Sequence, residues 1–247
     1  MPKPVQRANL SGQVFDQLRD DILNKTFAPG QRLPSERELC ELLEVNRSSV
    51  REALKRLEQA RLIDIRHGNG SVVLDFKLHG GFELLPQLLT GQGQINRVAM
   101  RSILEIRSLI SPEIARLAAR RIEAPELAEL ERMVELIEAC PQQSPDELQL
   151  HDFEFHQTLA RASENLALLF IHNSVREIYL QVRGVFAVMF DYPPKKKALY
   201  RKILEAARAH DEKKAARLCA ELIEDGNQRF SLWYEQMAPD ADPGPAA

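Results

Sequence analysis

Hydrophobic positions recur every three or four residues along most of the chain, which is the spacing of one face of an α-helix. One stretch departs from this spacing. Residues 61–66 alternate between apolar and polar, residues 67–70 form a glycine-containing turn, and residues 71–74 return. This pattern predicts a two-stranded hairpin. From 95 to 237 the helical spacing continues without a strand pattern. The sequence therefore predicts a mainly α-helical fold with one small hairpin near its N-terminus.

Two short helices are predicted immediately before the hairpin. Ser35 can cap the first, and Glu38 three residues later completes a capping box. Asn46 can cap the second after a short turn. That second helix is apolar on one face and rich in arginine and serine on the other, as a helix entering the major groove requires. Together they predict a helix-turn-helix followed by a wing.

Another helix is predicted upstream, over residues 11–25. Ser11 is expected to be its N-cap, and Pro29-Gly30 is expected to break the chain after it. This helix would complete a small N-terminal domain.

The N-terminal third resembles the winged helix-turn-helix of the GntR family of bacterial transcription regulators. The resemblance is carried by the runs Pro29–Leu39, Val45–Leu54 and Gly68–Gly70. It implies that this part binds double-stranded DNA. The residues expected at the DNA are Arg37, Asn46, Arg47, Ser48, Ser49, Arg51, His67, Gly68, Asn69 and Gly70.

Charge is unevenly distributed along the chain. The formal net charge is −3, yet residues 1–78 carry about +2 and the remainder about −5. This asymmetry favours a DNA-binding module joined to an acidic partner domain. No apolar run approaches the roughly 20 residues that cross a bilayer, and no secretory signal is evident. Cys40, Cys140 and Cys219 are widely spaced, so we expect reduced, buried thiols in a cytoplasmic protein that does not enter a membrane.

Four regions are predicted along the chain. Residues 1–75 form the winged helix-turn-helix, and residues 76–95 form a linker with a short helix over Phe82–Leu89. Glycines on both sides of that helix would let the DNA-binding domain reorient. Residues 96–237 form a bundle of six or seven helices that binds an effector and dimerises, with one of the helices over residues 165–190. The basic run Lys195–Lys197 is expected to be an exposed loop and helix start. Residues 238–247 are expected to be a disordered tail.

The predicted bundle resembles the C-terminal domain of the FadR branch of the GntR family. The resemblance is carried by the Arg107 segment, by Asp152–His156 with Ala162–Asn165, and by Leu199–Ala207. It implies an effector pocket inside the bundle. Many relatives hold a divalent metal there with an aspartate and three histidines.

A metal site in this chain would have Asp152 and His156 as its ligands, because residues four apart share a helix face. Tyr200 stands where the family has a second histidine, and Asn227 is the polar residue nearest to the third position. Two ligands and a tyrosine are a poor set for zinc or nickel. No cofactor is therefore expected, and a buried hydrogen-bonded pair is the main alternative for Asp152 and His156.

Tyr200 at that position is a further resemblance, to the acyl-CoA-responsive members of the branch. It implies a long-chain fatty acyl-CoA as the effector. The residues expected to bind it are Arg107, Asp152, His156, Tyr200 and Trp233. Arg107 could grip a charged group with two parallel hydrogen bonds, or could instead form a salt bridge with Glu105 or Glu113. Asp225 and Arg229 replace neutral hydroxyl residues of the acyl-CoA binders, which leaves a small organic acid as a second candidate.

The resulting hypothesis is a homodimeric, ligand-responsive transcription regulator that binds a palindromic operator and is not an enzyme. Two alternatives stay open. The chain could be a metal-dependent enzyme using Asp152 and His156, although no complete ligand set or nucleophile appears. It could also be an architectural DNA binder without an effector, although the second domain is larger than dimerisation alone requires.

Overall fold

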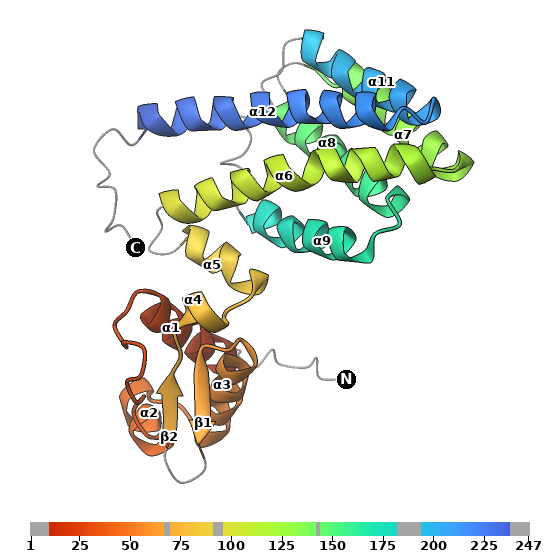
Figure 1. The fold of residues 1–247 in the computed structure, drawn as a ribbon. Helices are drawn as coiled ribbons and strands as arrows, with labels where there is room; N and C mark the ends of the chain where they lie inside the picture. The colour runs from red at the N-terminus through yellow and green to blue at the C-terminus, as the bar shows by residue number, and fades with distance from the viewer. Residues whose placement is uncertain (1–9, 67–69, 91–95, 142–143, 182–193, 238–247) are drawn as a thin grey trace, which may run out of the picture. The chain divides into compact units, whose positions relative to one another are not determined.

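The computed structural model describes residues 10–66, 70–90, 96–141, 144–181 and 194–237 (Figure 1). The chain divides into two compact units, Met1–Asn96 and Arg97–Ala247. Three predicted features lie outside the described residues: the turn residues 67–69, the linker glycines at 91 and 93, and the tail 238–247.

Three helices form the scaffold of the N-terminal unit: α1 (Leu10–Leu23), α2 (Glu36–Leu43) and α3 (Arg47–Gln59). The prediction of Ser11 as an N-cap is wrong, because Ser11 lies inside α1. The helix starts one residue earlier, where Leu10 extends the four-residue spacing that continues to Ile22. The predicted capping box at the start of α2 is confirmed. The side chain of Ser35 accepts a hydrogen bond from the backbone N–H of Glu38, whose carboxylate accepts one from the N–H of Ser35.

The wing is a two-stranded antiparallel sheet, β1 (Ile63–Arg66) and β2 (Gly70–Val73), with Ile63 paired to Val73. Gly70 has a φ of +78°, a conformation that L side chains rarely adopt. The segment after Pro29 is more than a chain break. The N–H of Leu33 donates to the carbonyl of Ser71 at 2.9 Å, so this segment runs along β2 as an additional edge.

The core of this unit is built from apolar side chains of all three helices and the wing. The residues with little or no exposed surface include Val14, Leu18, Ile22, Leu39, Val50, Leu54, Leu57, Leu62, Ile63 and Val73. Burying the apolar face of α3 against α1 leaves its polar face outward.

The linker contains more structure than the single short helix predicted. It consists of α4 (Phe76–His79), a 3-10 turn η1 (Phe82–Leu84) and α5 (Leu85–Thr90). Gly80 has an ordinary extended backbone, but a Cβ atom there would lie 2.6 Å from the carbonyl oxygen of Phe76 and 2.7 Å from a Leu84 methyl group. This glycine is therefore needed for close packing.

The C-terminal unit is all-helical in its described part, as predicted. Its elements are α6 (Arg97–Arg121), α7 (Ala124–Ala139), α8 (Pro145–Ala162), α9 (Leu166–Gln181), α11 (Pro194–Arg208) and α12 (Glu212–Met237). The long helices α6 and α12 pack against each other, and α11 packs against α7 and α12 (Figure 1). The helix predicted over residues 165–190 is described only to Gln181. No helix in the described ranges has the length and apolar composition needed to cross a membrane.

Candidate nucleic-acid interface and effector site

The exposed face of α3 presents two arginines one helical turn apart. The side chains of Arg47 and Arg51 are 68% and 58% exposed. Both donate through Nε to the carboxylate of Glu36 on α2, at 3.0 Å from Arg47 and 2.8 Å from Arg51. The apolar face of α3 is buried, so these two cations are available on the surface of the unit. Arginines in this arrangement can contact guanine bases or phosphates.

The start of α3 orders the two serines differently. Asn46 caps the helix as predicted, with its side-chain oxygen accepting from the N–H of Ser49 at 2.9 Å. Ser48 is exposed and donates its hydroxyl to the same oxygen at 2.6 Å. Ser49 is only 9% exposed. Ser48 and Asn46 are therefore presented at the helix N-terminus, whereas Ser49 faces the interior of the unit.

The remaining residues predicted to contact DNA lie on α2 and in the wing. The side chain of Arg37 is 85% exposed, and its Nε lies 3.5 Å from Oε1 of Glu41 on the same helix. Gly70 begins β2. His67, Gly68 and Asn69 are outside the described residues.

In the C-terminal unit, four residues predicted to bind the effector form one buried cluster around Asp152. The Tyr200 hydroxyl donates to Oδ1 of Asp152 at 2.6 Å. Nε2 of His156 lies 3.4 Å from the same oxygen, and a terminal nitrogen of Arg107 lies 3.9 Å from Oδ2. These side chains come from α6, α8 and α11, so the bundle assembles what the sequence separates.

The electrostatics of this cluster favour a charged aspartate. Burial alone raises the pKa of Asp152. The electrostatic interaction and hydrogen bond with His156, the positive charge of Arg107 and the hydrogen bond from Tyr200 outweigh burial, so the pKa of Asp152 lies below its usual value. The neighbouring His172 stacks on Phe153 with ring centroids 4.9 Å apart. Burial, followed by electrostatic interaction with His156, lowers the pKa of His172 to about 4, so this imidazole is neutral at physiological pH.

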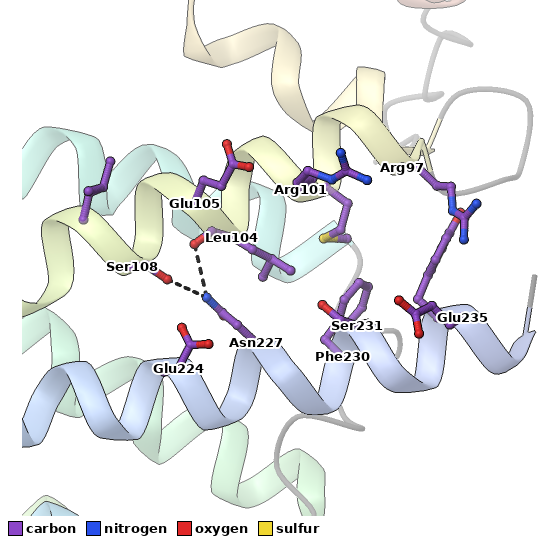
Figure 2. A pocket seen from close by; sticks show the side chains of 13 residues that line it. Arg97, Arg101, Leu104, Glu105, Ser108, Glu224, Asn227, Phe230, Ser231 and Glu235 are labelled. Carbon is purple, nitrogen blue, oxygen red and sulfur yellow. Dashed lines mark hydrogen bonds between the residues drawn. The ribbon is translucent and has the colours of Figure 1, made fainter. Parts of the chain in front are cut away.

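Asn227 on α12 connects this cluster to the surface of the unit. Its side-chain oxygen accepts from a terminal nitrogen of Arg107 at 3.4 Å. Its amide nitrogen donates to the Ser108 hydroxyl at 2.8 Å and to the Leu104 carbonyl at 3.2 Å, as Figure 2 shows. Asn227 thus joins α12 to α6 through both the oxygen and the nitrogen of its side-chain amide.

A groove of about 700 Å³ lies between α6 and α12 on the outer side of Asn227 (Figure 2). Met100, Leu104 and Phe230 are buried at its floor. Its other lining residues are mostly polar or charged, namely Arg97, Arg101, Glu105, Ser108, Leu109, Glu224, Asn227, Ser231, Tyr234 and Glu235. The lining carries two arginines and three glutamates, so the floor suits an apolar part of a ligand and an anionic part would have to meet Arg97 or Arg101.

Trp233 does not line this groove. The centroid of its ring lies 5.6 Å from that of Phe230 and 6.5 Å from that of Tyr234, and both of these residues line the groove. Trp233 therefore packs against two of the rings that line the groove, and its described ring contacts do not include the Asp152 cluster.

Comparison with known proteins identifies both units. The family described as "Bacterial regulatory proteins, gntR family" matches residues 10–73, and the FCD domain matches residues 102–225. The HTH-type transcriptional regulator Mce2R of Mycobacterium tuberculosis is 36% identical over 226 residues, which cover 91% of this chain and 93% of that protein. The chain belongs to the GntR family.

Further relatives extend this result. A fatty acid metabolism regulator protein of Serratia proteamaculans is 30% identical over 174 residues, covering 70% of each chain. The solved structure of Lar, titled as controlling the expression of the Listeria monocytogenes agr system, aligns with a TM-score of 0.56 at 16% identity. It covers 91% of this chain and 99% of that one and supports the fold alone. This GntR-family chain is thus a transcriptional regulator with an effector-responsive FCD domain, and not an enzyme.

Asp152 and His156 were the candidate metal ligands, and their described contacts bear on that possibility. Asp152 already faces the Tyr200 hydroxyl, His156 and Arg107, and the guanidinium would repel a second cation close to it. No group of three or more His, Cys, Asp or Glu side chains suited to a metal occurs within the described ranges. His210 points elsewhere, with its Nδ1 2.8 Å from the Ala119 carbonyl oxygen. Among the described residues, Asp152, His156 and Tyr200 therefore form an incomplete ligand set for a metal ion.

Two sequence-based expectations about basic residues need correction. Arg107 was expected to pair with Glu105 or Glu113 if its role were structural. Its described contacts are with Asp152 and Asn227 instead, and Glu113 pairs with Arg116 at 2.7 Å. The reason is that a residue's helix face, and not its distance in sequence, decides its partners.

The basic segment at the start of α11 was expected to be exposed. Lys196 is largely buried and faces Asp225, and Lys197 donates to the Cys140 carbonyl. The α11 N-terminus packs into the bundle, so these lysines satisfy internal groups. Asp225 also pairs with Arg229 at 3.1 Å, one turn along α12.

The thiols follow the sequence expectation in part. Cys140 and Cys219 are buried, Cys40 is half-buried, and all three are unbridged. Burial raises the pKa of Cys219 to about 12, so this thiol stays protonated.

Sequence reasoning missed two features of the site. Glu36 was assigned no role, although an acid in the first turn of α2 is the natural partner for arginines on the next helix. The groove was also missed. Its floor residues follow the ordinary helical spacing of a core, and only packing shows that α6 and α12 leave space above them.

Proposed function

We propose that two copies of this chain bind a palindromic operator and that a long-chain fatty acyl-CoA controls the binding. DNA binding and response to an effector follow from the family. Pairing of two copies is inferred from how helix-turn-helix proteins read DNA. One recognition helix covers only a few base pairs, and a twofold dimer places two of them about 34–36 Å apart in successive major grooves.

The groove between α6 and α12 is the observation that carries the effector proposal. Met100, Leu104 and Phe230 offer a buried apolar floor for an acyl chain. Arg97 and Arg101 lie at the border and offer cations for the phosphates of coenzyme A. The fatty acid metabolism regulator of Serratia proteamaculans is a relative whose printed name points to the same chemical class.

The position of the groove also suits a control element. Arg97 and Met100 belong to the first turn of α6, which directly follows the linker from the DNA-binding unit. Inside the unit, Asn227 links the groove to Arg107 and thus to the Asp152 cluster. A ligand changes operator affinity only if it binds better to one arrangement of the protein than to another. A ligand seated at the start of α6 would act where the two units are joined.

The proposal is tested with an operator selected from a pool of random duplexes. Affinity for this duplex is measured by fluorescence anisotropy with oleoyl-CoA, with coenzyme A alone and with oleate. We expect oleoyl-CoA to weaken operator binding at least tenfold, and coenzyme A to have little effect. An operator affinity that no acyl-CoA changes would contradict the proposal.

The location of the ligand is tested with Arg101→Ala. Arg101 is exposed, so the fold should be kept, and the concentration of oleoyl-CoA needed for half its effect should rise about tenfold. The matched control is Arg120→Ala, which removes an exposed arginine from the other end of the same helix. An equal response in both variants would place the ligand outside the groove.

One observation favours a second effector class, a small organic acid held by Arg107. The described contacts of this guanidinium, 3.4 Å to Asn227 and 3.9 Å to Asp152, are longer than the roughly 2.7–2.9 Å of a strong charged hydrogen bond. Arg107 can therefore still bind a carboxylate. A panel of hydroxy acids and dicarboxylates in the same assay, with Arg107→Ala as the variant, separates the two effectors.

A further inference from the structure

We propose that Glu36 is a positioning residue for operator recognition, which holds Arg47 and Arg51 so that their outer nitrogens meet bases in preference to backbone phosphates. This inference rests on the proposed binding to an operator and adds a determinant of its specificity. Glu36 belongs to α2, not to the recognition helix, and it was not among the residues expected at the DNA.

The geometry joins three side chains from two helices. Oε2 of Glu36 accepts from Nε of Arg47 at 3.0 Å and from Nε of Arg51 at 2.8 Å. Oε1 accepts a second contact from Nε of Arg51, at 3.0 Å. The carboxylate side chain is 31% exposed, less than either arginine. It therefore lies beneath the two guanidinium groups, on the protein side of the surface.

Electrostatics explain why an acid is needed at this place. Arg47 and Arg51 are four residues apart on α3, so their like charges lie on one face and repel each other. A carboxylate in contact with both offsets this repulsion. Partial burial raises the pKa of Glu36. The hydrogen bonds and charges of the two arginines have a larger, opposite effect, so the pKa lies below its usual value and the group is ionised at neutral pH. The three charges together sum to +1.

The hydrogen bonds to Glu36 leave most donors of both arginines for DNA. A guanidinium has five N–H groups, and Glu36 contacts each arginine only through the single N–H at Nε. The four N–H groups on the terminal nitrogens are those that can reach the O6 and N7 acceptors of guanine. Fixing Nε removes much of the rotational freedom of a long side chain before DNA arrives. Base contacts give sequence specificity and phosphate contacts do not, so arginines held toward the bases would favour the operator over other DNA.

The test compares Glu36→Gln with wild type on the selected operator and on a scrambled duplex of equal length. The amide keeps the size of the side chain but removes the charge and replaces one acceptor with a donor. We expect operator affinity to fall and affinity for the scrambled duplex to rise, so that their ratio drops about tenfold. Because one negative charge is lost, the protein can release up to about one more counterion from the scrambled duplex. The plot of log affinity against log salt concentration should therefore become steeper.

The matched control is Glu52→Gln, which removes the same charge from an exposed position on α3 itself. We expect its ratio of operator to scrambled affinity to stay within about twofold of wild type. If Glu36→Gln and Glu52→Gln shift both duplexes equally, Glu36 acts only through its charge and the positioning role is overturned. A higher operator affinity with an unchanged ratio would likewise overturn it, because Glu36 would then be a competitor of DNA.

A double-mutant cycle guards against an effect on folding. In a protein that already carries Arg47→Ala and Arg51→Ala, Glu36→Gln should leave the affinity ratio unchanged, since nothing remains to be positioned. An equal loss in both backgrounds would show a structural role and overturn the proposal. If wild-type protein binds no selected duplex more tightly than the scrambled one, the proposed function itself is refuted. If Glu36→Gln keeps the full wild-type preference for the operator, only the role of Glu36 is refuted.

Discussion

The two units use charged side chains in opposite settings. On α3, Arg47 and Arg51 are exposed and share one partner from the neighbouring helix. In the FCD domain, Asp152 is buried beneath His156, Arg107 and Tyr200. An exposed charge is screened by water and contributes little to folding, whereas a buried charge is strongly coupled to its partners. The first unit thus presents its charges to an outside partner, and we expect the second to depend on its charges for its own structure.

The strongest test of this contrast is Asp152→Ala. Removing the carboxylate leaves Arg107 without its buried counter-charge and Tyr200 without its acceptor, so the unfolding free energy should fall by about 3–5 kcal/mol. Denaturant unfolding followed by circular dichroism measures the loss. The control Glu154→Ala removes an exposed acid from the same helix and should change stability by less than about 0.5 kcal/mol. Equal small effects would show that the cluster is not coupled to folding.

A smaller effect is expected from pH, through His172. In the unfolded chain this imidazole takes up a proton as the pH falls through about 6.5, whereas in the folded protein it does so only near 4. Between these values the unfolded state binds more protons, so stability decreases as the pH falls and the loss is complete below about 4. We expect protonation of His172 to lower the unfolding free energy by roughly 2 kcal/mol, after allowing for its partial exposure.

The measurement compares wild type with His172→Phe, which keeps a ring against Phe153. Unfolding free energies at pH 7, 6, 5 and 4.5 should fall less steeply in the variant. The control is His79→Gln, an exposed histidine in the linker, which should follow the wild-type slope. Parallel slopes for wild type and His172→Phe would contradict the buried, neutral assignment of this residue.

The smallest effect is expected in the DNA-binding unit, from Ser35→Ala. The change removes the acceptor for the Glu38 N–H and the donor to the Glu38 carboxylate, and it should cost about 1 kcal/mol. Thermal unfolding measures this loss. Ser102→Ala is the control, because Ser102 lies in the interior of α6 and only donates to the Val98 carbonyl. A cap that proves neutral would show that tertiary packing alone defines the start of α2.

Much of the DNA-binding unit could be predicted because its determinants are local. The capping box at Ser35 and the cap at Asn46 depend on residues within a few positions of one another. The exposed arginines of α3 follow from the spacing of its apolar face. The bridge from Glu36 to those arginines could not be predicted, because it joins residues 11 and 15 positions apart and depends on how α2 packs beside α3.

Most helical segments of the described chain, and the exposed side of α3 that carries Arg47 and Arg51, could be read from the sequence, because helix spacing and capping act over a few residues. Only the tertiary structure decided that Arg107, Asp152, Tyr200 and Asn227 meet, and that α6 and α12 leave a groove above Phe230. Those contacts span up to 120 positions in the chain. They depend on the packing of several helices at once, and the local order of residues does not encode that packing.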